Sequence, residues 1–184
     1  MSFFKENIDF GQFIGDAIFN SVNFYDANSE KLISMADEFK VLNKNDAVEL
    51  KELGYSLIIA DLMVSCKVNF SGKISNKEIG KTIGFLYTRF LNEIKHLDEN
   101  EIKKKTDALG KLLGAVETNE KSNNTEEELK FLLCSTFAKF YSGGNLKDKK
   151  VEGKRFAVFK LAKVFVKADI IKTMLKEFKI KQKS

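Results

Sequence analysis

Proline is absent from all 184 positions of the chain. Because proline removes a backbone N–H and breaks helix interiors, a chain without it is free to form long helices. Apolar residues recur along most of the sequence at about 3.6-residue intervals, the period of an amphipathic helix. Helix starts are marked by a hydroxyl residue with glutamate three positions later, as in Ser75 with Glu78 and Thr125 with Glu128. These signals predict an all-α fold.

The periodic segments and the polar breaks between them predict a compact bundle of seven or eight helices without strands, in a single domain spanning 1–184. The expected helices cover roughly 3–24, 30–42, 46–68, 76–97, 99–117, 126–141, 150–168 and 169–182. The first break is expected at 26–28, with Ser29 as the N-cap of the second helix. The third helix is expected at the centre, because its segment from Leu57 to Cys66 is apolar on nearly all sides.

Three short segments each carry two glycines spaced four residues apart. The pairs are Gly11 with Gly15, Gly80 with Gly84, and Gly110 with Gly114. A glycine inside a helix lowers helix stability by about 0.8–1.0 kcal/mol relative to alanine. A repeated glycine pattern therefore indicates a structural role. Each pair lies on the flank of an apolar stripe, which predicts close crossings between helices of the bundle.

Several classes of protein are excluded by what the sequence lacks. No apolar run reaches the ~18 residues that a bilayer span needs, and the first residues do not form a secretory signal. The free thiols Cys66 and Cys134 then favour a reducing, cytoplasmic location. A single histidine excludes most histidine-based metal sites, so no metal or cofactor is expected. No Gly-x-Ser-x-Gly elbow or phosphate-binding loop is present, which favours a non-enzymatic role.

Asp61 is the most informative single residue, because it lies in the middle of an apolar helical face. A carboxylate buried there must pair, accept hydrogen bonds or shift its pKa upward. One interpretation is an internal ion pair or a cap on a neighbouring helix end. The other is an acid, base or ligand in a core pocket.

A second polar group follows the edge of the predicted helix over 76–97. Arg89, Glu93 and His96 fall at i, i+4 and i+7 there, a spacing typical of a surface row of ion pairs. Glu93 and His96 also match Glu-x-x-His, but a di-iron bundle needs a second copy, and the chain has no second histidine. Packing of this row against Asp61 would create the one enzyme-like polar pocket that the sequence offers.

The C-terminal quarter is strongly basic. Residues 147–184 include 13 basic and four acidic residues, a net charge of +9, which leaves −4 for the rest of the chain. A basic amphipathic helix is expected at about 169–184, opened by Asp169. Its lysine stripe and its apolar side predict the binding residues Lys172, Lys176, Lys179, Lys183, Met174 and Phe178. Lysine near a helix C-terminus also complements the helix dipole, so part of the pattern needs no ligand.

These observations favour a non-enzymatic, helical protein-binding module, such as an adaptor, an inhibitor or an immunity-type factor. Its partner would present an acidic surface to the basic C-terminal helix. One alternative is a nucleic-acid-associated protein that uses the same lysines on the phosphate backbone. Another is a small-ligand binder or enzyme built around Asp61. The sequence does not specify the partner or the oligomeric state.

Overall fold

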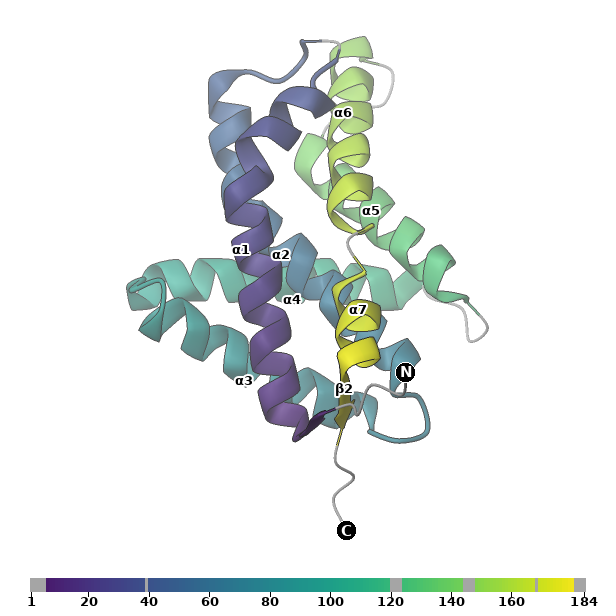
Figure 1. Cartoon of the computed structure of the whole chain (residues 1–184). Coiled ribbons are helices and arrows are strands. Elements are labelled where there is room, and N and C mark those ends of the chain that lie inside the picture. The colour runs from purple at the N-terminus through teal and green to yellow at the C-terminus, as the bar shows by residue number, and fades with distance from the viewer. Residues whose placement is uncertain (1–5, 39, 120–123, 144–147, 168, 181–184) are drawn as a thin grey trace.

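The computed structural model describes residues 6–38, 40–119, 124–143, 148–167 and 169–180, and these residues fold into a helical bundle (Figure 1). The long helices are α1 (Phe10–Ala36), α2 (Lys44–Asn69), α3 (Asn76–Glu93), α4 (Glu99–Asn119), α5 (Glu126–Ser142) and α6 (Lys149–Phe165). A short helix, α7 (Ile170–Glu177), follows, and two strands, β1 (Glu6–Ile8) and β2 (Phe178–Ile180), lie at the two ends of the described chain. The predicted all-α class is confirmed, with six long helices and one short helix in place of the eight expected ranges.

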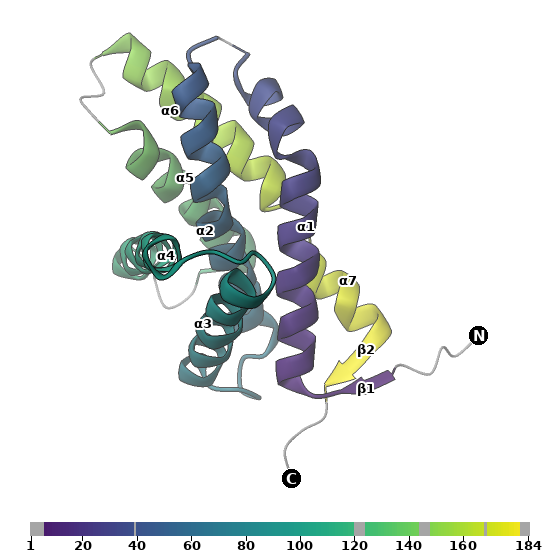
Figure 2. The ribbon, with the colours of Figure 1, turned by 90° about the vertical axis from the view of Figure 1, so that its left-hand side faces the viewer.

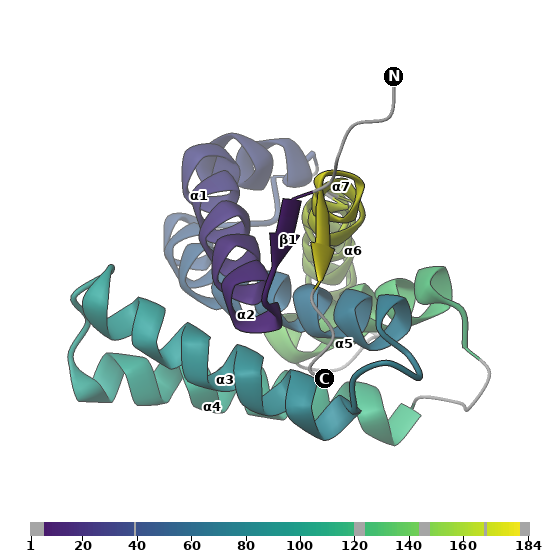
Figure 3. The same ribbon diagram turned by 60° about the horizontal axis from the view of Figure 1, so that its bottom comes forward.

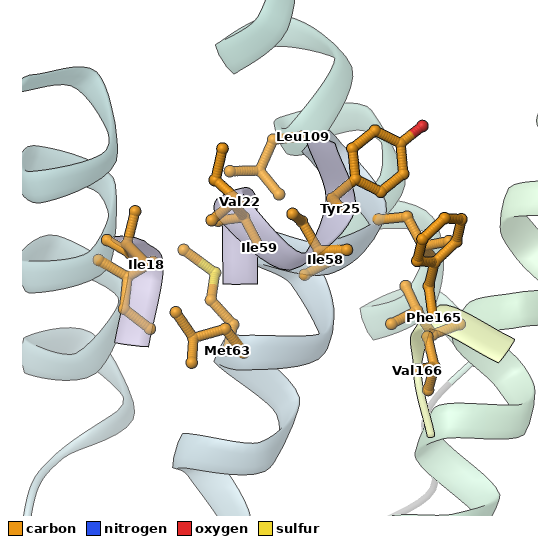
Figure 4. Close-up of a cluster of buried hydrophobic side chains, with 14 of the residues drawn as sticks. Ile18, Val22, Tyr25, Ile58, Ile59, Met63, Leu109, Phe165 and Val166 are labelled. Atoms are coloured by element: carbon orange, nitrogen blue, oxygen red, sulfur yellow. The ribbon is translucent and has the colours of Figure 1, made fainter. Parts of the chain in front are cut away.

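Helix α2 is the centre of the bundle, as its sequence predicts. Every residue from Ser56 to Cys66 is buried, and α2 packs against α1, α3, α4, α5 and α7. Figure 3 shows α3 and α4 side by side in one layer, while α5 and α6 form a second pair. The side chains between α1, α2 and the end of α6 form part of one continuous apolar core (Figure 4).

A single helix, α1 (Phe10–Ala36), takes the place of the two helices predicted over 3–24 and 30–42, so the break expected at 26–28 was wrong. The Asn28 side chain donates to the Phe24 carbonyl at 2.8 Å, within the helix, instead of opening a turn. Asp26 accepts hydrogen bonds from Tyr55 and Lys95, which fix its carboxylate in tertiary contacts. Ser29, expected as an N-cap, is buried in the helix interior.

The C-terminal helix is shorter than predicted, and the expectation of no strands was also wrong. Helix α7 ends at Glu177, and β2 then pairs in parallel with β1 in the register Glu6↔Phe178, Asn7↔Lys179, Ile8↔Ile180 (Figure 2). Ile8 is buried and Ile180 half-buried, so pairing covers apolar side chains from both ends of the chain. Strands of three residues are too short to produce a visible alternation in the sequence.

The paired glycines do not mark close helix crossings. A methyl group built at Gly15, Gly80, Gly84, Gly110 or Gly114 would meet no heavy atom within 4 Å, and at Gly11 it would meet only the nearby Asp9 side chain. The close approach in the structure occurs at Gly54 of α2, where the ring of Tyr25 from α1 packs directly on the glycine.

Candidate functional site

Asp61 lies on the buried face of α2, with 8% of its surface exposed. The nearest cation is Lys130 of α5, whose Nζ is 3.8 Å from Asp61 Oδ1. That oxygen has no hydrogen-bond partner within the described residues. Burial raises the pKa of Asp61 to about 7, and the nearby ammonium of Lys130 offsets only part of this effect.

Lys130 connects Asp61 to the surface of the molecule. Its side chain is 13% exposed, and its Nζ lies 3.1 Å from Glu126 Oε1 and 2.7 Å from Asp169 Oδ1. The capping box of Thr125 and Glu128 fixes where α5 begins, and the i, i+4 spacing then aligns Glu126 with Lys130. Burial opposes the charge on Lys130, but the surrounding carboxylates outweigh it and raise the pKa of this lysine.

Lys172 of α7 completes the group. Its Nζ is 3.1 Å from Glu126 Oε2 and 3.5 Å from Asp169 Oδ2. Asp169 occupies the N-cap position of α7 as predicted, but its side chain makes no capping bond, since it binds the two lysines. We call Asp61, Glu126, Lys130, Asp169 and Lys172 the charge cluster. It places three carboxyl groups around two ammonium groups.

A small cavity of about 20 Å³ lies on the inner side of the charge cluster. Its walls come from α1, α2, the end of α6 and the start of α7. The residues that line it are Ser21, Phe24, Ile58, Asp61, Leu62, Ser65, Phe165, Ile170 and Ile171. The volume admits about one water molecule, and Asp61 and the two serines are the polar groups that face it.

A larger depression of about 370 Å³ lies on the outer side, between α5, the end of α6 and the start of α7. We call it the α5–α7 pocket. It is lined by Glu126, Glu127, Lys130, Phe131, Cys134, Lys163, Val166, Lys167, Asp169 and Lys172. Burial raises the pKa of the Cys134 thiol to about 12, so this group is uncharged at neutral pH.

Two of the lysines that line the pocket are exposed to solvent. Lys163 and Lys167 are exposed and make no ion pair among the described residues. Beside them, Phe131 is 58% exposed and meets the ring of Phe159 edge-on, with the ring centroids 5.4 Å apart. The Lys163 ammonium lies 5.8 Å from the centre of the Phe159 ring. The rim therefore combines free positive charge with exposed aromatic surface.

The second polar row does not reach Asp61. Arg89 and Glu93 are exposed and pair with each other at 2.7 Å, as the i, i+4 spacing predicts for a surface row. They border a shallow depression shared with α4. His96 is exposed after the end of α3, with φ of 52°. None of the three lines the cavity at Asp61 or the α5–α7 pocket, so the enzyme-like pocket considered from the sequence is not formed by the described residues.

The predicted binding residues of the C-terminal segment have different environments. Lys172 lies in the α5–α7 pocket but is already paired, while Lys176 and Lys179 are exposed. Met174 is buried, and Phe178 is half-buried against the core, so neither is an exposed apolar anchor. Lys183 lies outside the described residues.

The charged residues that line the α5–α7 pocket were mostly not predicted from the sequence. Glu126 and Lys130 resemble an ordinary surface pair at i, i+4, and Lys163 and Lys167 resemble a solvated helix face. The available signal was Asp61 itself, since a carboxyl group on an apolar face must pair with a cation, accept hydrogen bonds or carry a proton.

Comparison with family models, with curated proteins and with solved structures found no match. Within the described residues, no helix has the length and apolar character needed to cross a membrane. No group of three histidine, cysteine or acidic side chains is placed to hold a metal ion in that part of the chain.

Proposed function

We propose that the chain is a non-enzymatic binding module that holds an acidic segment of a partner protein in the α5–α7 pocket. The observation that carries this proposal is the pair Lys163 and Lys167, which stands without carboxylate partners among the described residues beside the exposed ring of Phe131. An acidic side chain would pair with the lysines, and a neighbouring apolar side chain would cover the aromatic rim. The proposed contact surface therefore lies at the junction of α5, α6 and α7. The sequence had predicted it on the outer face of the C-terminal helix.

The carboxylates of the pocket favour a protein partner over nucleic acid. Glu126, Glu127 and Asp169 line the pocket together with the lysines. A phosphate backbone carries closely spaced negative charges and needs a continuous positive surface, so interleaved carboxylates would repel it. A peptide can instead place one carboxylate at the lysines and leave the acidic positions of the pocket opposite uncharged residues.

The side chains of the pocket also fit binding better than catalysis. The raised pKa values of Cys134 and Lys130 keep the thiol protonated and the amine charged, so neither is a nucleophile at neutral pH. Lys130 is held by carboxylates on three sides, which fixes its position.

The proposal is tested with a short fluorescent peptide in which glutamates flank leucines, followed by fluorescence anisotropy. The variant Lys163→Glu/Lys167→Glu reverses both free charges of the pocket. Its matched control is Lys77→Glu/Lys81→Glu, the same charge change at the same spacing on exposed positions of α3. We expect the pocket variant to weaken binding by about tenfold or more, and the control to change it by less than about threefold. Equal effects of the two variants would refute the pocket as the binding site.

A further inference from the structure

The start of α7 covers Asp61. Ile170 and Ile171 form one wall of the cavity that Asp61 lines, and Ile171 and Met174 are buried where α7 packs on α1 and α2. The bond from Lys130 to Asp169 and the bond from Lys172 to Glu126 tie the same segment to α5. Asp61 therefore lies beneath α7, and Lys130 contacts both.

The charges around Asp61 are unbalanced when it is ionised. Its charged neighbours are Lys130 and Glu126 from α5 and Asp169 at the start of α7, and Lys172 joins the cluster through its ion pairs with Glu126 and Asp169. Two ammonium groups then meet three carboxylates. The other titratable neighbours are thiols, Cys66 on α2 and Cys134 on α5, and burial raises the pKa of both to about 12, so they supply no charge.

The other side chains that line the cavity beside Asp61 are uncharged. Helix α1 contributes the Ser21 hydroxyl and the Phe24 ring to the cavity, and α6 contributes Phe165. A proton on Asp61 makes the charge cluster neutral, with two ammonium groups and two carboxylates. It also removes the cost of a buried oxygen that carries charge but accepts no hydrogen bond.

We propose that α7 and β2 form a proton-controlled lid, docked over Asp61 when this residue carries a proton and released when it ionises. Release opens the carboxylate to bulk water, whereas in the docked state it borders only a cavity with room for about one water molecule. Ionised Asp61 also competes with Asp169 for Lys130, the side chain that holds the start of α7. A helix of eight residues has little stability on its own, so a released α7 unfolds and does not block water.

Proton linkage determines how strongly the docking of α7 depends on pH. In the docked state burial holds the pKa of Asp61 at about 7, and in the released state it returns toward the ordinary value of 3.8. Release is therefore accompanied by loss of a proton. Between these two values the docking equilibrium constant falls by up to about tenfold for each unit of rising pH.

The lid also bears on the α5–α7 pocket, since Asp169 and Lys172 form one of its walls. This consequence rests on the proposed function: an acidic peptide would bind best below neutral pH, where α7 is docked. The docking of α7 is a property of the chain alone, so it is tested without any partner.

The experiment measures amide hydrogen exchange of residues 170–177 at about pH 5.5 and about pH 7.5, with each rate divided by the intrinsic rate at that pH. In the wild-type chain we expect the protection of α7 to fall by about tenfold or more, while amides in the middle of α2, which exchange only on global unfolding, remain better protected than α7 at both pH values. Asp61→Asn keeps the shape of the side chain but cannot ionise, so its α7 protection should not change with pH. His96→Gln removes the one histidine of the chain and should behave like wild type.

A wild-type α7 protection that is the same at both pH values would overturn the proposal. So would an equal fall in Asp61→Asn, or a fall that His96→Gln abolishes. The wild-type and His96→Gln results decide the question even when Asp61→Asn does not fold. Because no peptide is present, these outcomes are independent of whether the α5–α7 pocket binds an acidic partner.

Discussion

Replacing Gly54 by alanine tests the packing of α1 on α2 at its closest point. A methyl group at this position would lie 1.9 Å from Tyr25 Oη and 2.1 Å from Tyr25 Cζ. Tyr25 is fully buried, and its hydroxyl donates to the Leu50 carbonyl at 2.8 Å. The ring cannot move aside freely, because the rings of Phe165 and Tyr55 pack against it with centroids 4.6 and 5.5 Å away.

Three contributions set the expected change in the free energy of unfolding for Gly54→Ala. Alanine gains about 1 kcal/mol over glycine from helix propensity. Overpacking costs about 1–3 kcal/mol, and a buried hydroxyl that loses its acceptor costs about 1–3 kcal/mol more. We therefore expect Gly54→Ala to lower the free energy of unfolding by about 3 kcal/mol, measured by urea denaturation.

Gly110→Ala is the matched control for this prediction. It makes the same substitution inside α4, where the new methyl group meets no atom within 4 Å. Only the propensity gain remains, so this variant should be more stable than wild type by up to about 1 kcal/mol. A Gly54→Ala chain that is as stable as Gly110→Ala would refute the packing argument.

Other substitutions test the electrostatics. Because the folded-state pKa of Asp61 is raised, the stability that its proton provides is fully present below about pH 4 and lost as pH rises to about 7. Asp61→Asn should therefore raise the unfolding free energy at about pH 8 by as much as about 4 kcal/mol and change it little at about pH 4, as urea titrations at the two pH values would show. Lys130→Met leaves Asp61 without its ion-pair partner and Lys172 as the remaining cation of the charge cluster, so it should cost about 3–5 kcal/mol at about pH 8 and less at about pH 5. Arg89→Ala removes only an exposed ion pair and should leave the melting temperature unchanged; a clear drop would contradict the surface position of this residue.

Helix ends that depend on residues close together in the chain could be predicted from the sequence. Thr125 and Glu128 form the expected capping box, and the Ser75 hydroxyl accepts from the Glu78 amide, so α5 and α3 begin where the sequence places them. The central position of α2 followed from the apolar run between Leu57 and Cys66, because such a run must be covered on all sides.

Features that depend on distant partners were not predictable. Lys130 is far from Asp61 along the chain, and only the packing of α5 on α2 brings them together. The continuity of α1 depends on tertiary bonds to Asp26, and the exchange of helix for strand at Phe178 depends on pairing with β1. Composition gives the positive charge of the C-terminal quarter but does not reveal which of its lysines are already paired.

The most direct test of the binding surface is to present the wild-type chain with the acidic peptide and with a labelled single-stranded oligonucleotide. Both titrations are made at about 50 and about 200 mM salt. We predict that the peptide binds more tightly than the oligonucleotide at the higher salt and loses less than about tenfold in affinity between the two conditions. Tighter binding of the oligonucleotide, with a loss of roughly two decades or more over the same range, would contradict the account and make nucleic acid the ligand of the α5–α7 pocket.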